Sequence, residues 1–170
     1  MLIVAVVLLA LITDTQAQSH TEYQVKAAFL YNFARFVEWP AEAFATRDAP
    51  VQICVLGENP FGSDLDQIVQ GKSVSGRRVT VRNLRNGQKV RGCHIVFAGP
   101  LALARSKPAL TGNDARGILI VGESSSPEGT MINFILENDR VRFEVNNRAA
   151  TAAGLKISSK LLSLAIRITE

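Results

Sequence analysis

Two cysteines and a neighbouring histidine are the residues of this chain whose types could form a covalent bridge or bind a metal. Cys54 and Cys93 lie 39 positions apart, and His94 follows the second cysteine. In an oxidising compartment, an even pair of cysteines predicts a disulfide. The alternative is a metal site made by both thiolates and His94. Tetrahedral zinc needs three or four ligands, however, and the other histidine, His20, stands near the amino terminus. The pair therefore favours a disulfide, and no Cys-x-x-Cys motif indicates a redox-active site.

No sequence motif indicates catalysis or nucleotide binding. Residues 57–62 have the glycine spacing of a phosphate-binding loop, but Ser63 and Asp64 follow where that motif needs Lys and Ser or Thr. Residues 122–126 do not form a nucleophile elbow. The acidic residues Glu137 and Asp139 lie in a predicted hairpin turn, where side chains usually face solvent. We therefore expect neither enzymatic activity nor a cofactor.

Basic residues are concentrated in the middle of the chain. No acidic residue lies between Asp66 and Asp114, whereas this stretch contains Lys72, Arg77, Arg78, Arg82, Arg85, Lys89, Arg91, Arg105 and Lys107. The stretch lacks the interleaved aromatic residues of a nucleic-acid groove, and an exported protein meets little nucleic acid, so we expect no such partner. A solvated face is one interpretation. Docking to an acidic protein surface or to anionic lipid headgroups is the other.

The amino-terminal segment predicts export from the cytoplasm. Its first twelve residues are all apolar, which is shorter than the about 20 residues that a membrane-spanning helix needs. Residues 15–17 form a small-x-small pattern suited to cleavage after Ala17, although no Lys or Arg precedes the apolar run. We expect residues 1–17 to be a cleaved signal peptide, with a retained membrane anchor as the alternative. Losing Asp14 would change the net charge from +4 to +5.

The mature residues 18–170 have the composition of one folded domain, since 47% of the whole chain is apolar and 20% is charged. Helical spacing of apolar residues predicts an amphipathic helix over residues 22–38, with Lys26 between the apolar positions and Trp39-Pro40 at its end. Short apolar runs predict strands at residues 51–56, 78–82, 94–98 and 117–121. Short helices are expected at residues 64–70 and 101–110.

The last part of the chain predicts a β-hairpin followed by a helix. Residues 131–136 and 141–145 flank a polar turn, and residues 146–166 have a helical pattern that Gly154 bends or divides. Strands that alternate with helices indicate parallel β-α-β units. The predicted fold is therefore an α/β three-layer sandwich, in which helices cover both faces of a mostly parallel sheet of about six strands.

Several motifs together resemble the YfiR-like family of periplasmic proteins of Gram-negative bacteria. The resemblance covers essentially all of residues 22–168 with the same order and spacing. The residues that carry it are 26–33 (KAAFLYNF), 36–40 (FVEWP), 57–62 (GENPFG), 93–97 (CHIVF), 132–134 (INF), 140–146 (RVRFEVN), 149–150 (AA), 153–159 (AGLKISS) and 161–162 (LL).

The resemblance implies an α/β protein of the periplasm, often a homodimer, without catalytic activity of its own. It implies a repressor that binds the periplasmic sensor domain of an inner-membrane diguanylate cyclase, which lowers cyclic di-GMP and biofilm formation. It also implies an outer-membrane lipoprotein that can sequester the repressor, and a bridge between Cys54 and Cys93. A second cysteine pair that some members carry near residues 128–135 is missing from this sequence.

The expected partner surface lies near the carboxyl terminus, because the family pattern is concentrated there. It comprises the polar hairpin around Glu137 and Arg140 and the segment that follows. The candidate contact residues are Glu137, Arg140, Glu144, Asn146, Arg148, Lys156 and Lys160. The alternative function is a periplasmic small-ligand binding module, since open α/β sheets bind ligands where their strands end. Residues 57–62, 99–100 and 122–127 would then line the crevice.

Overall fold

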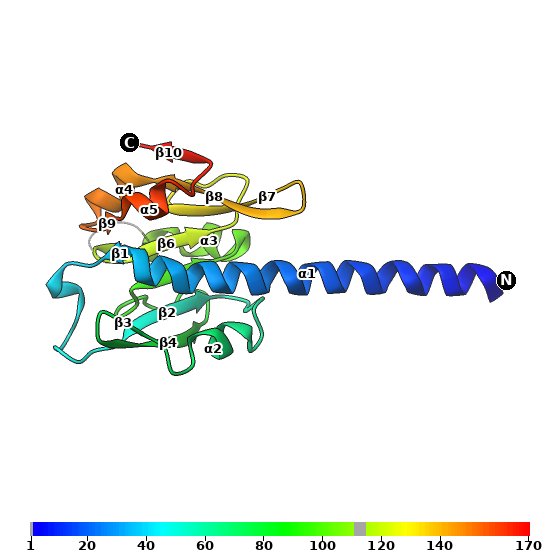
Figure 1. Ribbon diagram of the computed structural model, residues 1–170, viewed down its shortest axis with the longest axis horizontal. Coiled ribbons are helices and arrows are strands. Elements are labelled where there is room, and N and C mark those ends of the chain that lie inside the picture. The colour runs from blue at the N-terminus through cyan, green and yellow to red at the C-terminus, as the bar shows by residue number, and fades with distance from the viewer. Residues whose placement is uncertain (1, 111–114) are drawn as a thin grey trace.

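A computed structural model describes the backbone of residues 2–110 and 115–170, and the side chains of residues 18–108, 110 and 115–170. A long helix, α1 (Leu2–Phe36), lies across one face of a large sheet (Figure 1). The predicted signal peptide, residues 1–17, lies outside the residues whose side chains are described. Within the described part of the chain, no helix is both long enough and apolar enough to cross a membrane.

The main sheet contains eight strands in the order β10-β8-β7-β6-β5-β2-β4-β3. In chain order they are β2 (Val51–Leu56), β3 (Ser73–Val74), β4 (Arg77–Leu84), β5 (Ile95–Ala98), β6 (Leu119–Gly122), β7 (Ile132–Glu137), β8 (Arg140–Asn146) and β10 (Arg167–Thr169). The pairs from β4 to β7 are parallel, and so is the β8–β10 pair, while β7–β8 and β3–β4 are antiparallel. The mostly parallel α/β sheet is confirmed, and the edge strands β3 and β10 come in addition to the six predicted strands.

Helices lie on both faces of this sheet, which confirms the three layers. The helix α2 (Asp64–Val69) packs beside α1, and α3 (Pro100–Ser106) lies on the other side (Figure 1). The two helices lie on opposite faces because of the strand order. The β2-to-β4 connection, which contains α2, runs toward one sheet edge, and the β5-to-β6 connection, which contains α3, runs toward the other. Right-handed crossovers in opposite directions place their helices on opposite faces. Short 3-10 helices are η1 (Ala41–Ala43) and η2 (Lys107–Leu110).

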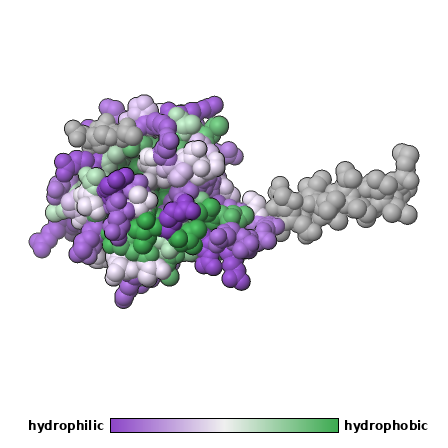
Figure 2. All heavy atoms as spheres, turned by 90° about the horizontal axis from the view of Figure 1, so that it is seen from above, coloured by the Kyte–Doolittle hydropathy of each residue, from purple (hydrophilic) through white to green (hydrophobic). Residues whose placement is uncertain are grey.

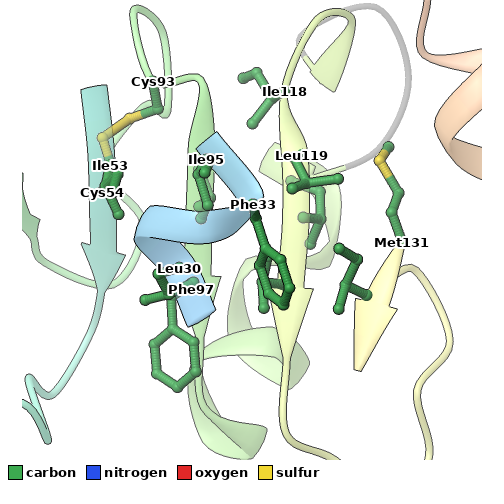
Figure 3. Close-up of a cluster of buried hydrophobic side chains, with 14 of the residues drawn as sticks. Leu30, Phe33, Ile53, Cys54, Cys93, Ile95, Phe97, Ile118, Leu119 and Met131 are labelled. Carbon is green, nitrogen blue, oxygen red and sulfur yellow. A yellow bond between two sulfur atoms is a disulfide. The ribbon is translucent and has the colours of Figure 1, made fainter. Parts of the chain in front are cut away.

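Aromatic side chains of α1 form the centre of the core. The ring of Phe33 lies 5.3 Å from that of Phe143 and 5.6 Å from that of Phe134, and Phe29 contacts the same two rings. Figure 3 shows Leu30 and Phe33 over β5 and β6, where Ile95 and Leu119 are fully buried. Edge-to-face and offset ring pairs of this kind add to the hydrophobic gain from burial. The predicted apolar helix face is therefore a core face.

The predicted division of the last helix at Gly154 is confirmed, but the helix bounds differ from the prediction. The first helix begins at Leu2 and not at residue 22, and backbone pairing shortens both predicted helices. The first helix ends at Phe36, since β1 (Val37–Glu38) pairs antiparallel with β9 (Lys156–Ile157). The last helix is split into α4 (Asn147–Ala152) and α5 (Ser159–Leu162), with β9 between them. Gly154 makes this break possible because its φ of +82° lies in the left-handed region that L side chains rarely adopt.

The predicted disulfide is confirmed. Cys54 on β2 and Cys93, two residues before β5, are bonded with their Cα atoms 5.9 Å apart (Figure 3). The bond uses both thiols, so the alternative metal site with His94 is wrong. Both cysteines are buried, and their bond connects β2 to the residues just before the neighbouring strand β5. The loop that the bond closes contains α2, β3 and β4.

Replacing both cysteines, Cys54→Ala with Cys93→Ala, should lower the free energy of unfolding by about 3–4 kcal/mol, because an uncrosslinked loop of this length gains chain entropy on unfolding. Urea denaturation of the oxidised wild type and of the double variant measures the difference. The reduced wild type is the control and should resemble the variant. Equal midpoints for the variant and the oxidised protein would contradict the predicted stabilisation.

Candidate functional site at the carboxyl ends of the strands

A cavity of about 560 Å³ lies where β2 and β5 end and the chain leaves β6. The three loops that the sequence predicted to line a crevice all contribute to it. Glu58 and Pro60 come from the first loop, Gly99 and Pro100 from the second, and Glu123 from the third. The loops meet because parallel strands end at the same edge of the sheet. The predicted crevice is therefore present as a cavity.

Two glycines allow the loops to pack this closely. At Gly57, where φ is +88°, a Cβ would lie 2.8 Å from Oδ1 of Asn86 and 3.1 Å from Cβ of Ala102. At Gly122, a Cβ would lie 2.7 Å from Thr130 and 2.8 Å from Leu103. Contacts under 3.0 Å essentially never occur at real Cβ atoms, so a side chain at Gly57 would displace Asn86 and one at Gly122 would displace Thr130 and Leu103. At Gly57 the positive φ adds backbone strain.

The inner wall of the cavity is a buried ionic cluster. Lys26 of α1 is only 4% exposed, and its ammonium donates to Glu123 at 2.6 Å and also to Glu22 one helical turn earlier. The same Nζ lies 4.5 Å from the centre of the Tyr23 ring. Two partly buried carboxylates therefore contact one buried ammonium, and removing the ammonium would leave both carboxylates without their cation.

Tyr23 links this cluster to the cavity. Its hydroxyl donates to Oε1 of Glu123 at 2.9 Å, and both residues line the cavity. Burial, followed by the charge and the hydrogen bond of Glu123, raises the pKa of Tyr23 well above its ordinary value of 10.0. The phenol therefore stays protonated at every physiological pH, and it acts as a fixed donor.

The cavity lining combines charged and apolar side chains. Charged groups of both signs, Glu58, Glu123 and Arg105, share it with apolar side chains such as Phe97 and the exposed Leu101. None of the described lining residues is Ser, Cys, His or Lys. The polar pair that the cavity presents is the Tyr23 hydroxyl with the Glu123 carboxylate, beside the charged side chains of Glu58 and Arg105.

The seven predicted partner-contact residues do not form one surface. Glu137 and Arg140 pair across the tip of the β7–β8 hairpin, at the end of the sheet where the cavity lies. The remaining residues of the set are at or toward the opposite end, where β8 finishes and α4, β9 and α5 follow; these are Glu144, Asn146, Arg148, Lys156 and Lys160.

Three residues of that set already have partners within the chain. Glu144 forms an ion pair of 2.6 Å with Arg167 of β10. The side chain of Asn146 accepts from the amide of Ala149 and so caps α4. Lys156 lies 3.5 Å from Glu38 in an exposed pair across β1 and β9. Glu144 and Asn146 therefore have structural roles that the sequence pattern did not separate from partner binding.

The sequence did not predict the ionic cluster. Lys26 was expected on the polar side of its helix because it stands between apolar positions, whereas the structure buries it. Its partner Glu123 is 97 positions away in a loop, and no local pattern connects the two. A lysine four residues after a glutamate was the one visible sign, and that spacing is common on exposed helix faces.

His94, directly before β5, is a second buried polar residue. It is 3% exposed, its ring stacks on Phe44 at 4.4 Å, and its Nδ1 accepts from the amide of Gln52. Burial lowers the pKa of His94 below its ordinary value of 6.5, helped by the charge of Arg77 and opposed by the carbonyl of Ala43. Its role is structural, since it lies at the end of the sheet away from the cavity.

Replacing the buried lysine, Lys26→Met, should lower the free energy of unfolding by about 3–5 kcal/mol, because it leaves two carboxylates without their cation. The matched control is Lys156→Met in the exposed pair with Glu38, which should cost less than about 1 kcal/mol. Chemical denaturation at pH 7 measures both. Similar losses in the two variants would show that the buried cluster has no special role.

The free energy of unfolding should fall as the pH drops from about 7 to about 5, because the unfolded chain takes up a proton on His94 that the folded protein resists. In the His94→Gln variant this contribution to the pH dependence of the free energy of unfolding is absent, because the amide does not titrate. Its oxygen can still accept the hydrogen bond from the amide of Gln52. Denaturant titrations at several pH values measure the two slopes. Identical slopes would contradict the lowered pKa.

The chain was compared with protein families and with curated proteins. A family model described as YfiR/HmsC-like matches residues 23–166, which include Lys26 and Glu123 of the ionic cluster, the cavity loops and the disulfide. The search of curated proteins gives no match. Since the matched segment is most of the 170 residues, the chain belongs to the YfiR/HmsC-like family.

Proposed function

We propose that this protein is a periplasmic repressor of an inner-membrane diguanylate cyclase. Membership of the YfiR/HmsC-like family implies a periplasmic regulator of diguanylate cyclase signalling, and the family match over residues 23–166 is the observation that carries the proposal. In the proposed mechanism the protein binds the periplasmic sensor domain of the cyclase and keeps the enzyme inactive. Cyclic di-GMP and biofilm formation then decrease.

Export to the periplasm is part of this proposal. Residues 1–17 act as the signal peptide, and residues 18–170 form the mature α/β domain. The Cys54–Cys93 disulfide supports this location, because such bonds form and persist in oxidising compartments. A homodimer and an outer-membrane lipoprotein that sequesters the repressor belong to the same proposal, as the family resemblance implies.

Repression of this kind requires a difference in affinity. A binding protein shifts its partner between an active and an inactive state only if it binds the inactive state more tightly. The protein needs no catalytic group for this task, but it needs an exposed surface that distinguishes the two states. The described part of the molecule offers exposed hydrophobic and basic side chains near the β7–β8 hairpin that suit such a surface.

The cavity favours a second candidate function, a periplasmic small-ligand binding module. Its volume lies within the range of ligand sites, and it combines charged groups of both signs with apolar walls. Such a module would act without a cyclase partner. The two functions differ in one consequence, since only the repressor changes cyclic di-GMP when it is lost.

Deleting the gene should raise intracellular cyclic di-GMP, because the cyclase loses its inhibitor, and the full chain supplied in trans should restore the low level. Mass spectrometry of cell extracts measures the nucleotide. The matched control is a chain that lacks residues 2–17, which should stay in the cytoplasm and fail to restore repression. An unchanged level in the deletion strain would reject the repressor function and leave the ligand-binding module.

A further inference from the structure

A groove of about 390 Å³ lies between α1 and the β7–β8 hairpin, on the other side of Glu22 from the cavity. Its apolar walls are Val25 and Phe29 of α1 and Leu136 and Val141 of the hairpin. Val25 is 41% exposed and Leu136 is 49% exposed, which is unusual for large apolar side chains that lie so close together. Figure 2 shows hydrophobic side chains gathered beside the place where α1 enters the body.

The strand register extends this apolar surface toward the sheet edge. Leu136 pairs with Val141, and Phe134 pairs with Phe143, which packs against α1. Because side chains alternate along a strand, these four residues share the face that α1 covers. Ile168 of β10 pairs with Val145 on that same face and is 39% exposed, so the apolar face continues past α1 to the edge of the sheet.

Charges of both signs border the groove, but among the residues that the structure describes its two acidic side chains are engaged within the chain and its two arginines are not. Glu22 is held by Lys26, and Asp139 accepts a hydrogen bond from Gln18. Arg140 and Arg142 bound the groove on the hairpin side and are exposed, and within the described residues neither forms an ion pair. A partner surface that contacts these two arginines would therefore place carboxylates beside its apolar side chains.

We propose that this groove is the surface that docks the regulated membrane protein, through a segment of that partner with apolar side chains flanked by Asp or Glu. The inference rests on the proposed repressor function and deepens it. It places the main contact on α1 and the hairpin tip, and not on the segment from Asn146 to Lys160. The apolar pair Val25 and Leu136 forms the centre of the contact, and Arg140 and Arg142 form its rim.

The test is complementation of the deletion strain with two groove variants, Leu136→Asp and the double variant Arg140→Glu with Arg142→Glu. Each should leave cyclic di-GMP at the level of the deletion strain, because a charge on the apolar wall or a reversed rim weakens docking. The matched control is Arg47→Glu with Arg116→Glu, two exposed arginines that precede β2 and β6 at the opposite end of the sheet, which should repress like the wild type. Immunoblots of periplasmic extracts and melting curves check that all variants are exported and folded.

The outcomes separate this inference from the function on which it rests. If deletion alone leaves cyclic di-GMP unchanged, the repressor function is wrong. If deletion raises it and both groove variants still repress, the function holds and the groove is not the docking surface. A second copy of this chain is the other possible occupant. Sedimentation in which Leu136→Asp converts a wild-type dimer into a monomer would assign the groove to self-association and overturn the proposal.

Discussion

The buried ammonium of Lys26 is the interaction on which both candidate surfaces depend. It holds α1 to the loop after β6 through Glu123, at the end of the sheet where the parallel strands finish. On one side of this contact, Tyr23 and Glu123 form the inner wall of the cavity. On the other side, Glu22 and the following turn of α1 form one wall of the groove. The ion pair thus adds a second fixed contact to the aromatic packing between α1 and the sheet.

Much of the fold could be predicted from the sequence because it depends on local patterns. The six central strands are marked by short apolar runs, and the cavity loops are marked by the glycines and prolines that end those runs. The two-residue strands β1 and β9 show no such pattern, because each is too short for alternation to appear. Their pairing nevertheless decides where α1 ends and where the last helix breaks.

The contacts of the candidate site were harder to predict, because they join residues that lie far apart in the sequence. Cys54 and Cys93 could be paired by elimination, since the chain has two cysteines. The partners Lys26 and Glu123 could not be paired, because any of the chain's 15 acidic residues was a possible partner. Among the expected contact residues, Glu144 and Asn146 proved to hold β10 and α4 in place. A motif that is concentrated in one segment therefore indicates packing as readily as it indicates binding.

The proposed function is repression of a membrane diguanylate cyclase by binding. Its most direct test is to titrate the purified, oxidised protein into permeabilised membrane vesicles from a strain that lacks the gene, with both sides of the membrane accessible, while cyclic di-GMP synthesis from GTP is measured. The account predicts that synthesis decreases with added protein and reaches a plateau when the cyclase is saturated. Synthesis that stays constant at every concentration of the folded protein would contradict it.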